Sequence, residues 1–337
     1  MAKLNVLIAG CTGYIGIELV KLLIKHKRVN IKYLCGSSSV GKKISYFDKS
    51  IKNKLPKISK FNVSNLKNVD VIFTALPYGE AQKISKSLLK HNTLIDIAAD
   101  FRLGAKDYLK WYKKKHKAPL NIKKSIYSLP ELNKKSLKNY QIISCPGCYP
   151  TSILLPLKPL IEKGLIISRN IIIDSKSGYS GAGRGVHKKY ENKNLYESLS
   201  AYGVSNHRHN SEIEQELKYT MKKNVEFSFT PHLSPMFRGI LSTIYVNLNK
   251  SISHDKVYKY LKQYYKNNTF IKIMNNIYIS TNDVINTNLC HISICRSKHK
   301  NKLVILSAID NLIKGGSGQA VQNMNNKFNF PKNMGLI

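Results

Sequence analysis

Apolar residues in the first hundred positions form short runs that alternate with longer amphipathic stretches. The longer stretches place apolar residues three and four positions apart, which predicts helices at Ile15–His26 and Glu80–His91. The short runs predict buried strands at Leu4–Ala9, Ile31–Cys35, Asp70–Ala75 and Thr93–Ala98, with Gln141–Cys145 as a later strand. This alternation is typical of a Rossmann-like α/β domain with a parallel sheet and right-handed crossovers.

The pattern changes after Pro146, where a helix is predicted over Thr151–Lys163 and a Gly/Ser-rich stretch follows at Ser175–Gly185. The later apolar runs are more widely separated and predict strands at Ile171–Asp174, Val225–Thr230, Ile240–Leu248, Ile277–Ser280 and Leu303–Ala308. A last helix is predicted over Asn311–Asn325. This half of the chain suits an α+β domain with a mostly antiparallel sheet.

The composition limits the possible class of protein. The chain has 337 residues, of which 42% are hydrophobic, enough for the cores of two domains. Its apolar runs fall short of the roughly 18 residues that a membrane span needs, and residues 1–9 lack the plan of a signal peptide, so we expect a soluble, cytoplasmic protein without a membrane partner. Six cysteines are too few for a disulfide scaffold, so any special cysteine is expected to be catalytic, redox-active or metal-binding.

The net charge of +36 raises the question of nucleic-acid binding. However, 48 of the 55 cationic side chains are lysines spread along the whole chain, and no spacing typical of a nucleic-acid-binding motif is present. We therefore expect a solvated lysine-rich surface and no nucleic-acid partner, with a basic nucleic-acid-binding protein kept as the remote alternative. The seven arginines are the informative cations, because Arg supplies planar, bidentate contacts to phosphate and carboxylate groups.

The first predicted strand leads into a glycine-rich turn and a helix, the arrangement of a dinucleotide site. Its predicted cofactor-binding residues are Gly10, Thr12, Gly13, Tyr14 and Gly16. After the second strand, where an NAD-binding domain usually has an acidic residue for the ribose, this chain has Ser37, Ser38 and then Lys42-Lys43. Hydroxyl and cationic groups suit a 2′-phosphate, so NADP is favoured over NAD.

The sequence Cys145-Pro146-Gly147-Cys148 joins a predicted strand to a predicted helix. A thiol at a helix N-terminus is favoured as thiolate, and Cys148 lies nearer the predicted helix start. Three functions are open for this segment: a nucleophilic Cys148 with a structural Cys145, a redox pair of the two thiols, or a zinc site with Cys290 and Cys295. The first is preferred. A thioredoxin-like redox fold is much smaller and does not follow a dinucleotide-binding half, and the residues between Cys290 and Cys295 indicate a strand.

A nucleophilic cysteine needs a proton partner and, for an anionic substrate, cations. His207 and His209 flank an arginine, and this cluster precedes the acidic-apolar run Ser211–Leu217. Four arginines stand beside glycines, aromatics or histidines, unlike the scattered lysines: Arg102, Arg184, Arg208 and Arg238. These residues are the candidates for acid–base catalysis and for holding substrate anions.

Together these motifs resemble those of the N-acetyl-gamma-glutamyl-phosphate reductase family, relatives of aspartate-semialdehyde dehydrogenase. The matching segments span almost the whole chain: Gly10–Gly16, Asp96–Leu103, Pro146–Thr151, Gly178–Arg184, His207–His209, Phe229–Ile240 and Asp310–Asn325. The resemblance implies an NADP-binding Rossmann domain at 1–147 and 311–337, and an inserted catalytic and oligomerisation domain at 148–310. The family usually has Asn where Cys145 stands, so the resemblance does not require a pair of thiols.

The resemblance also implies the reaction. NADPH would reduce N-acetyl-L-glutamyl 5-phosphate to the 5-semialdehyde in arginine biosynthesis, through a Cys148 thioester and with release of phosphate. His207 is the first choice for the acid–base residue, with His209 as alternative and Tyr202 as a positioning group. The first choices for substrate contacts are Arg102, Arg208 and Arg238, with Arg184 serving substrate or cofactor; Gly181, Asn311 and Lys314 complete the cofactor site.

Aspartyl phosphate and a carrier-bound aminoadipyl phosphate remain alternative substrates, because a pocket that differs by one methylene discriminates by only about 1–3 kcal/mol. We expect a homo-oligomer, either a dimer or a tetramer. We expect no bound metal.

Overall fold

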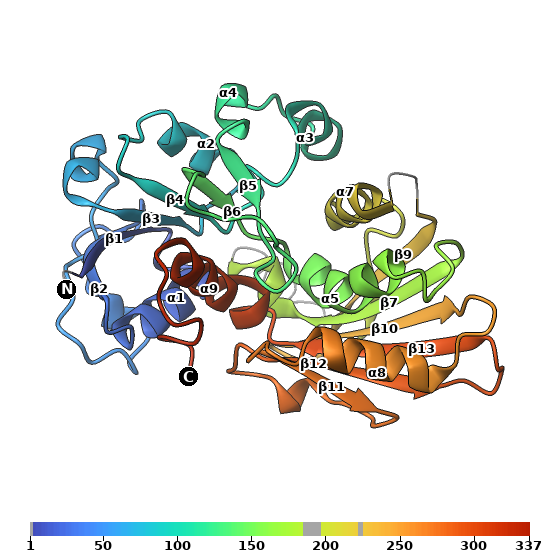
Figure 1. The fold of residues 1–337 in the computed structure, drawn as a ribbon. Coiled ribbons are helices and arrows are strands. Elements are labelled where there is room, and N and C mark those ends of the chain that lie inside the picture. Colours follow the sequence, from blue (N-terminus) through green and yellow to red (C-terminus); the bar gives the residue numbers. More distant parts are fainter. Residues whose placement is uncertain (1–2, 185–196, 222–224) are drawn as a thin grey trace. The chain divides into compact units, whose positions relative to one another are not determined.

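The computed structural model describes residues 3–184, 197–221 and 225–337. The chain forms two compact units, one made of Met1–Pro146 with Gly316–Ile337 and the other made of Gly147–Gly315. In Figure 1 the C-terminal helix, in red, lies beside the first helix, in blue, so the end of the chain completes the first unit.

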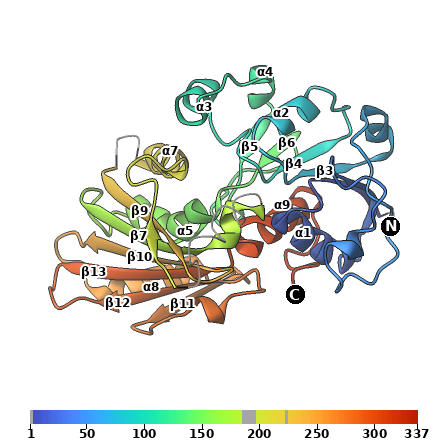
Figure 2. The ribbon, with the colours of Figure 1, turned by 180° about the vertical axis from the view of Figure 1, so that it is seen from behind.

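The first unit is built on a six-stranded sheet in which every pairing is parallel. In spatial order its strands are β2 (Val29–Cys35), β1 (Leu4–Ala9), β3 (Val71–Thr74), β4 (Thr93–Asp96), β6 (Ile142–Ser144) and β5 (Ser125–Tyr127). Its helices are α1 (Tyr14–Ile24), α2 (Glu80–Ser85), α3 (Ala105–Tyr112), α4 (Pro119–Ile122) and α9 (Gly318–Lys327). Helices α1 and α9 contact each other on one side of the sheet, and α2 lies on the other side (Figure 2).

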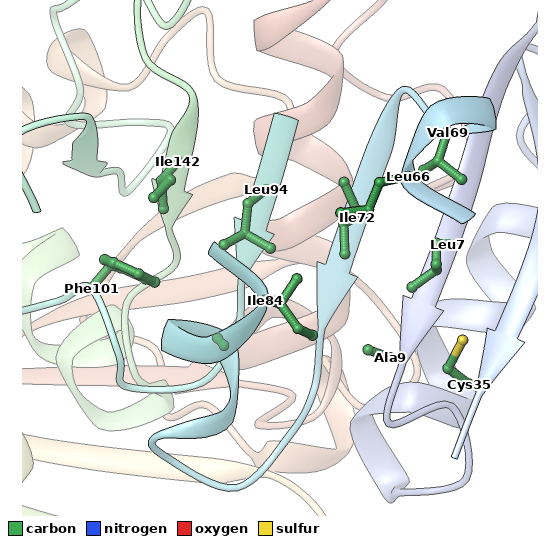
Figure 3. Packing of buried hydrophobic residues seen from close by; sticks show 11 residues of the cluster. Leu7, Ala9, Cys35, Leu66, Val69, Ile72, Ile84, Leu94, Phe101 and Ile142 are labelled. Carbon is green, nitrogen blue, oxygen red and sulfur yellow. The ribbon is translucent and has the colours of Figure 1, made fainter. Parts of the chain in front are cut away.

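The core between the sheet and α2 shows why the apolar runs form strands. Figure 3 shows Leu7, Ile72 and Leu94 from three neighbouring strands packed with Ile84 of α2 and Phe101. These side chains are at most 5% exposed, and their strands are buried over most of their length, as is usual for a parallel sheet with both faces covered. The predicted α/β class with a parallel sheet is confirmed.

The second unit contains a seven-stranded mixed sheet in which most neighbouring strands are antiparallel, as predicted. In spatial order the strands are β11 (Ile271–Asn275), β12 (Cys290–Arg296), β13 (Lys302–Ile309), β10 (Ile240–Asn247), β7 (Ile171–Gly178), β9 (Phe227–Ser234) and β8 (Ser200–Ala201). Helix α5 (Cys148–Glu162) packs on β10 and β13, α8 (His254–Tyr264) packs on β11 and β12, and α7 (His209–Met221) packs against α5.

Three predicted elements differ most from the structure in extent or place. The predicted helix Glu80–His91 ends at Ser85, and the Asn92 side chain accepts a hydrogen bond from the amide of Leu89 in the turn before β4. The predicted strand Ile277–Ser280 is not a strand. The strand lies earlier, at Ile271–Asn275, and ends where Asn276 takes a left-handed conformation with φ of +51°.

The third correction concerns the predicted helix Asn311–Asn325. The chain instead forms a π-helical turn at Ile313–Ser317, followed by α9 from Gly318. The Asp310 carboxylate accepts hydrogen bonds from the amides of Leu312 and Ile313, and its carbonyl accepts one from Gly315. These bonds fix a wide turn that periodicity alone does not distinguish from an α-helix.

Candidate active site

The loop between β1 and α1 contains the three glycines that predict a dinucleotide site. Gly10 has φ of +85°, and a side chain there would lie 2.8 Å from the carbonyl carbon of Ala75. A side chain at Gly16 would lie 2.8 Å from the backbone of Cys11. Gly13 differs, because it is the N-cap of α1, has no side-chain cap, and a side chain there would meet nothing closer than 3.7 Å. A helix N-terminus with open space before it fits the pyrophosphate of a nicotinamide dinucleotide.

The predicted 2′-phosphate site lies next to this loop. The carbonyl of Cys35, at the end of β2, accepts a hydrogen bond from the amide of Gly10 at 2.9 Å. Ser37 and Ser38 follow two and three residues later and are exposed, as is the Lys42-Lys43 pair. Thr12 and Tyr14 of the glycine loop are partly exposed. The first unit therefore brings most of the predicted cofactor residues to one end of its sheet.

Arg102 also belongs to the first unit, but its guanidinium is turned inward. Its Nε donates to the carbonyl of Cys145 and its Nη2 to the carbonyl of Ile97, both at 2.8 Å, and the residue is 8% exposed. These two donor groups hold the backbone that leads to Cys148. The arrangement supports a positioning role for Arg102 in place of the predicted substrate contact.

The environment of Cys145 separates it from Cys148. Cys145 is fully buried, the side-chain amide of Asn323 lies 3.6 Å from its sulfur, and burial raises the pKa of its thiol to about 12. A thiol in that state is protonated at neutral pH and is a poor nucleophile. Cys148 is partly exposed, whereas the other five cysteines are buried.

Cys148 is the first residue of α5, three residues earlier than the predicted helix start. Gly147 is the N-cap, and its amide donates a hydrogen bond of 2.9 Å to the carboxyl group of Glu212. Gly315 is required beside the thiol-bearing residue, because a side chain there would lie 2.6 Å from the β-carbon of Cys148. The structure thus places an accessible thiol at the positive end of a fifteen-residue helix, which favours the thiolate.

His209 lies directly against the start of this helix. A side chain at Gly147 would come within 2.7 Å of Cε1 of the imidazole, so the glycine is what allows the ring to approach. The same ring lies 3.8 Å from Glu212 through Nε2 and has its edge against Tyr149. Both predicted histidines pack against Tyr149 in this turn, but only His209 also lies against Gly147, the residue before Cys148.

His207 lies in a cluster of aromatic side chains. Its ring packs edge-on against Tyr149, Tyr202 and Phe229, with centroid distances of 5.5, 5.5 and 5.8 Å. Burial, followed by the neighbouring Arg208 charge, lowers the pKa of His207 to about 4. The imidazole is therefore neutral at pH 7, which makes it a poor general acid. The Tyr202 hydroxyl lies 3.0 Å from that of Tyr149, so Tyr202 lies in the same cluster.

The remaining predicted arginines differ in their surroundings. Arg208 and Arg184 are exposed. The side chain of Arg238 is 13% exposed, and its Nε lies 3.0 Å from the carboxylate of Asp310 while Nη1 donates to Asn286. Arg238 is thus held in one orientation from two sides, whereas Arg184 and Arg208 reach solvent.

The remaining predicted cofactor residues are Asn311 and Lys314, which follow β13, and Gly181. Asn311 is buried and connects two segments, because its carbonyl oxygen accepts from the Gly239 amide at 2.7 Å and its amide donates to Ser180 at 3.0 Å. Lys314 is fully buried in the π-helical turn, with Nζ 5.7 Å from the ring centre of Phe270. Gly181 is exposed next to this site, 3.5 Å from Asn311 when a β-carbon is added.

No group of three or more His, Cys, Asp or Glu side chains in the described ranges could hold a metal ion. Cys290 and Cys295, the partners considered for zinc, begin and nearly end strand β12 and are buried. Among the helices of the described part of the chain, none is long and apolar enough to cross a bilayer.

Two groups at the site were missed by sequence reasoning. Glu212 lies three residues after His209 on α7, a spacing that places both on one face of a helix, but the partner of its carboxyl group is 65 residues away. Gly315 lies in the terminal segment Asp310–Asn325 that carries the resemblance, and its contact with Cys148 gives it a local packing role.

Comparison with known protein families gives two matches that together span most of the chain. Residues 5–140 match the semialdehyde dehydrogenase NAD binding domain, and residues 148–311 match the semialdehyde dehydrogenase dimerisation domain. These two matched domains and the observed fold are those of a semialdehyde dehydrogenase-type reductase with an NAD-binding domain.

Curated relatives are similar over nearly their full length. The chain is 43% identical to the N-acetyl-gamma-glutamyl-phosphate reductase of Thermoanaerobacter pseudethanolicus, over 98% of this chain and 96% of that protein. It is 40% identical to the reductase of the same name from Ehrlichia canis, over 99% and 97%. This chain belongs to the N-acetyl-gamma-glutamyl-phosphate reductase family.

Solved structures agree on the fold. Aspartate semialdehyde dehydrogenase II from Vibrio cholerae superposes with a TM-score of 0.73 at 17% identity, over 98% of this chain and 99% of that one. The Candida albicans aspartate semialdehyde dehydrogenase, solved with NADP, gives a TM-score of 0.71 at 19% identity, over 97% and 99%. At this identity the likeness concerns the fold alone.

Proposed function

We propose that this chain reduces N-acetyl-L-glutamyl 5-phosphate to N-acetyl-L-glutamate 5-semialdehyde with NADPH, releasing phosphate, as a step of arginine biosynthesis. The observation that carries the proposal is the thiol of Cys148. It is the accessible thiol among six cysteines, it begins a long helix, and it lies next to a glycine that admits an imidazole. Membership of the reductase family supports the choice of substrate.

In the proposed reaction the Cys148 sulfur gives its proton to an imidazole and attacks the acyl carbon. The carbon–oxygen bond to the phosphoryl group breaks, phosphate leaves, and a thioester remains on Cys148. The nicotinamide cofactor, when bound, supplies a hydride to the thioester carbon. The carbon–sulfur bond then breaks, which frees the semialdehyde and returns Cys148 to its thiolate form.

We assign the acid–base role to His209 and a packing role to His207. His209 contacts the turn that carries Cys148, whereas the lowered pKa of His207 keeps that ring neutral at physiological pH. Tyr202 and Tyr149 hold His207 against the same helix end. The geometry therefore favours the second of the two histidines as the group that moves the proton.

For anion binding we propose the exposed Arg184 and Arg208 and the oriented Arg238, in the second unit. Arg102 instead fixes the strand end before Cys148 through its two carbonyl contacts. In the first unit, the glycine loop and Ser37 and Ser38 would hold the NADPH pyrophosphate and 2′-phosphate. Asn311 and Lys314 remain proposed cofactor residues.

The domain division and the assembly state are also proposals. We propose that residues 1–147 and 311–337 form the cofactor-binding domain, and that residues 148–310 provide catalysis and oligomer contacts. One face of the second sheet carries exposed apolar side chains on paired strands, Ile172 (53% exposed) opposite Tyr245 (46% exposed). We propose that the protein is a cytoplasmic homo-oligomer, a dimer or tetramer. The exposed apolar pair supports this sheet face as the place where copies meet.

The proposal is tested by following NADPH oxidation with N-acetylglutamyl, aspartyl and aminoadipyl phosphates. We expect turnover with the first, and replacing Cys148 by Ser should remove it while leaving NADPH binding in place. Cys145→Ser is the matched control, since it keeps the size of a buried side chain whose pKa already excludes a nucleophilic role. Normal turnover in Cys148→Ser would overturn the mechanism, and preference for another acyl phosphate would overturn the substrate.

A further inference from the structure

The carboxyl group of Glu212 is fully buried, although glutamate is rarely found inside a protein without a partner. Its Oε2 accepts a hydrogen bond from the Gly147 amide at 2.9 Å, and its Oε1 lies 3.8 Å from Nε2 of His209. One carboxyl group therefore contacts both the residue that precedes Cys148 and the imidazole beside it.

The two contacts matter because they link two helices: Gly147 precedes the first residue of α5, and His209 is the first residue of α7. Gly147 is an N-cap without a side chain, so the start of α5 receives no side-chain cap from its own residue. His209 is the first residue of α7, where the helix has just begun and the side chain is only partly buried. A carboxylate excluded from water needs a hydrogen-bond donor or a positive charge, and these two neighbours can provide one of each.

We propose that Glu212 is the positioning residue of the Cys148 reaction, holding the Gly147 amide and the His209 imidazole in one arrangement and favouring the protonated imidazole. The proton that leaves the Cys148 sulfur is then stabilised on His209 until the reaction returns it. This role rests on the function proposed above. Glu212 is then the third group of the proposed site, beside Cys148 and His209, and it does not touch the substrate.

The test compares Glu212→Gln with Glu216→Gln. Glutamine at 212 keeps the shape and an oxygen acceptor for Gly147 but removes the charge beside His209. Glu216 is the matched control, because it lies one turn later on α7 and also contacts α5, through a 2.7 Å ion pair with Lys158, away from the thiol. Both variants are assayed for kcat and KM across pH, with the folded fraction measured by circular dichroism.

We expect Glu212→Gln to lower kcat at least about tenfold, with both KM values within about twofold of the parent enzyme. The acidic limb of kcat/KM should move to lower pH, because an imidazole without a neighbouring carboxylate releases its proton at lower pH. Glu216→Gln should leave kcat and the pH profile unchanged. Glu212→Asp, which keeps the charge but shortens the reach to Gly147, should lower kcat without moving the acidic limb.

The assignment is overturned if Glu212→Gln keeps kcat within twofold, or if kcat falls only in step with the folded fraction while the pH profile stays fixed. It is also overturned if the acidic limb of Glu212→Asp moves as far as that of Glu212→Gln. Cys148→Ser separates this inference from the proposed function. An active Cys148→Ser enzyme refutes the thioester mechanism itself, whereas an inactive one beside a normal Glu212→Gln enzyme refutes only the positioning role.

Discussion

A single methyl group added at Gly147 should displace His209 from the catalytic thiol. Gly147 has φ of −68° and ψ of 162°, a conformation that any residue adopts, so alanine brings no backbone strain. Its β-carbon would lie 2.7 Å from Cε1 and 2.9 Å from Cδ2 of the His209 ring, and closer still to Nε2. Restoring ordinary contact requires the imidazole to move by about 1 Å.

A displacement of about 1 Å at a reacting group lowers the rate on the order of 100-fold, or about 2.7 kcal/mol of transition-state stabilisation. We therefore expect Gly147→Ala to lower kcat by that factor in the NADPH oxidation assay. Binding of NADPH through the glycine loop should stay unchanged, because that loop belongs to the other compact unit. The free energy of unfolding should fall by much less than the activation free energy rises, since a partly exposed ring can rotate away.

Gly104→Ala is the matched control for this prediction. Gly104 is the N-cap of α3, with φ of −62° and ψ of 158°, but a β-carbon there would meet nothing within 4 Å. That variant should keep full activity, and its stability should change by less than about 1 kcal/mol, because the lower unfolded-state entropy is offset by the poorer N-cap preference of alanine. A folded Gly147→Ala enzyme with kcat within twofold of the parent would refute the reasoning, because His209 would then have no part in the chemistry.

Three further predictions concern the cofactor loop, cofactor choice and acid stability. Gly13→Ala should fold normally but raise the KM for NADPH, whereas Gly10→Ala should unfold at lower temperature, because only the second clashes with backbone and has a positive φ; equal thermal midpoints would contradict this. NADPH should be preferred over NADH in kcat/KM, and replacing Lys42 and Lys43 by Ala should reduce the preference; equal use of both cofactors by the parent enzyme would contradict the 2′-phosphate site. The folded pKa of His207 lies near 4, below its unfolded value of about 6.5. The neutral ring therefore contributes about 3 kcal/mol to the free energy of unfolding, which is complete above pH 6.5 and is lost as pH falls toward 4. Urea unfolding of His207→Gln across this range should show a weaker loss of stability with falling pH, and an unchanged slope would refute the burial effect.

Cys148 can be predicted from the sequence, because its neighbours in the chain indicate where it lies. The residues that contact its turn cannot, because they are distant in the sequence. A cysteine between a strand and a helix, after Pro and Gly, indicates a helix N-terminus, and the structure begins α5 at that residue. The contact of Glu212 with Gly147 depends instead on α7 packing against α5, which no spacing along the chain encodes. The choice between His207 and His209 likewise depends on tertiary burial, because both have the same neighbours in sequence.

The same limit applies to the fold. Parallel strands in the first unit follow from continuous apolar runs, because both faces of that sheet are covered. The exposed apolar pair Ile277 and Tyr278 produced a false strand, since their apolar character reflects neither burial nor strand pairing. The π-helical turn after Asp310 depends on one carboxylate that accepts two successive amides, a detail that resembles an ordinary helix in the sequence pattern.

The rare arginines of this lysine-rich chain lie where a planar guanidinium group is needed. Some of these groups bind other parts of the protein instead of the substrate. Arg102 uses two donors on carbonyl oxygens, and one of these belongs to Cys145, in the segment that leads to the catalytic helix. A lysine could not span both carbonyls in fixed directions. Arg238 is oriented by a buried aspartate. The exposed Arg184 and Arg208 are therefore the stronger candidates for direct contact with substrate anions, and the diffuse lysine charge can raise the local concentration of such anions without selecting among them.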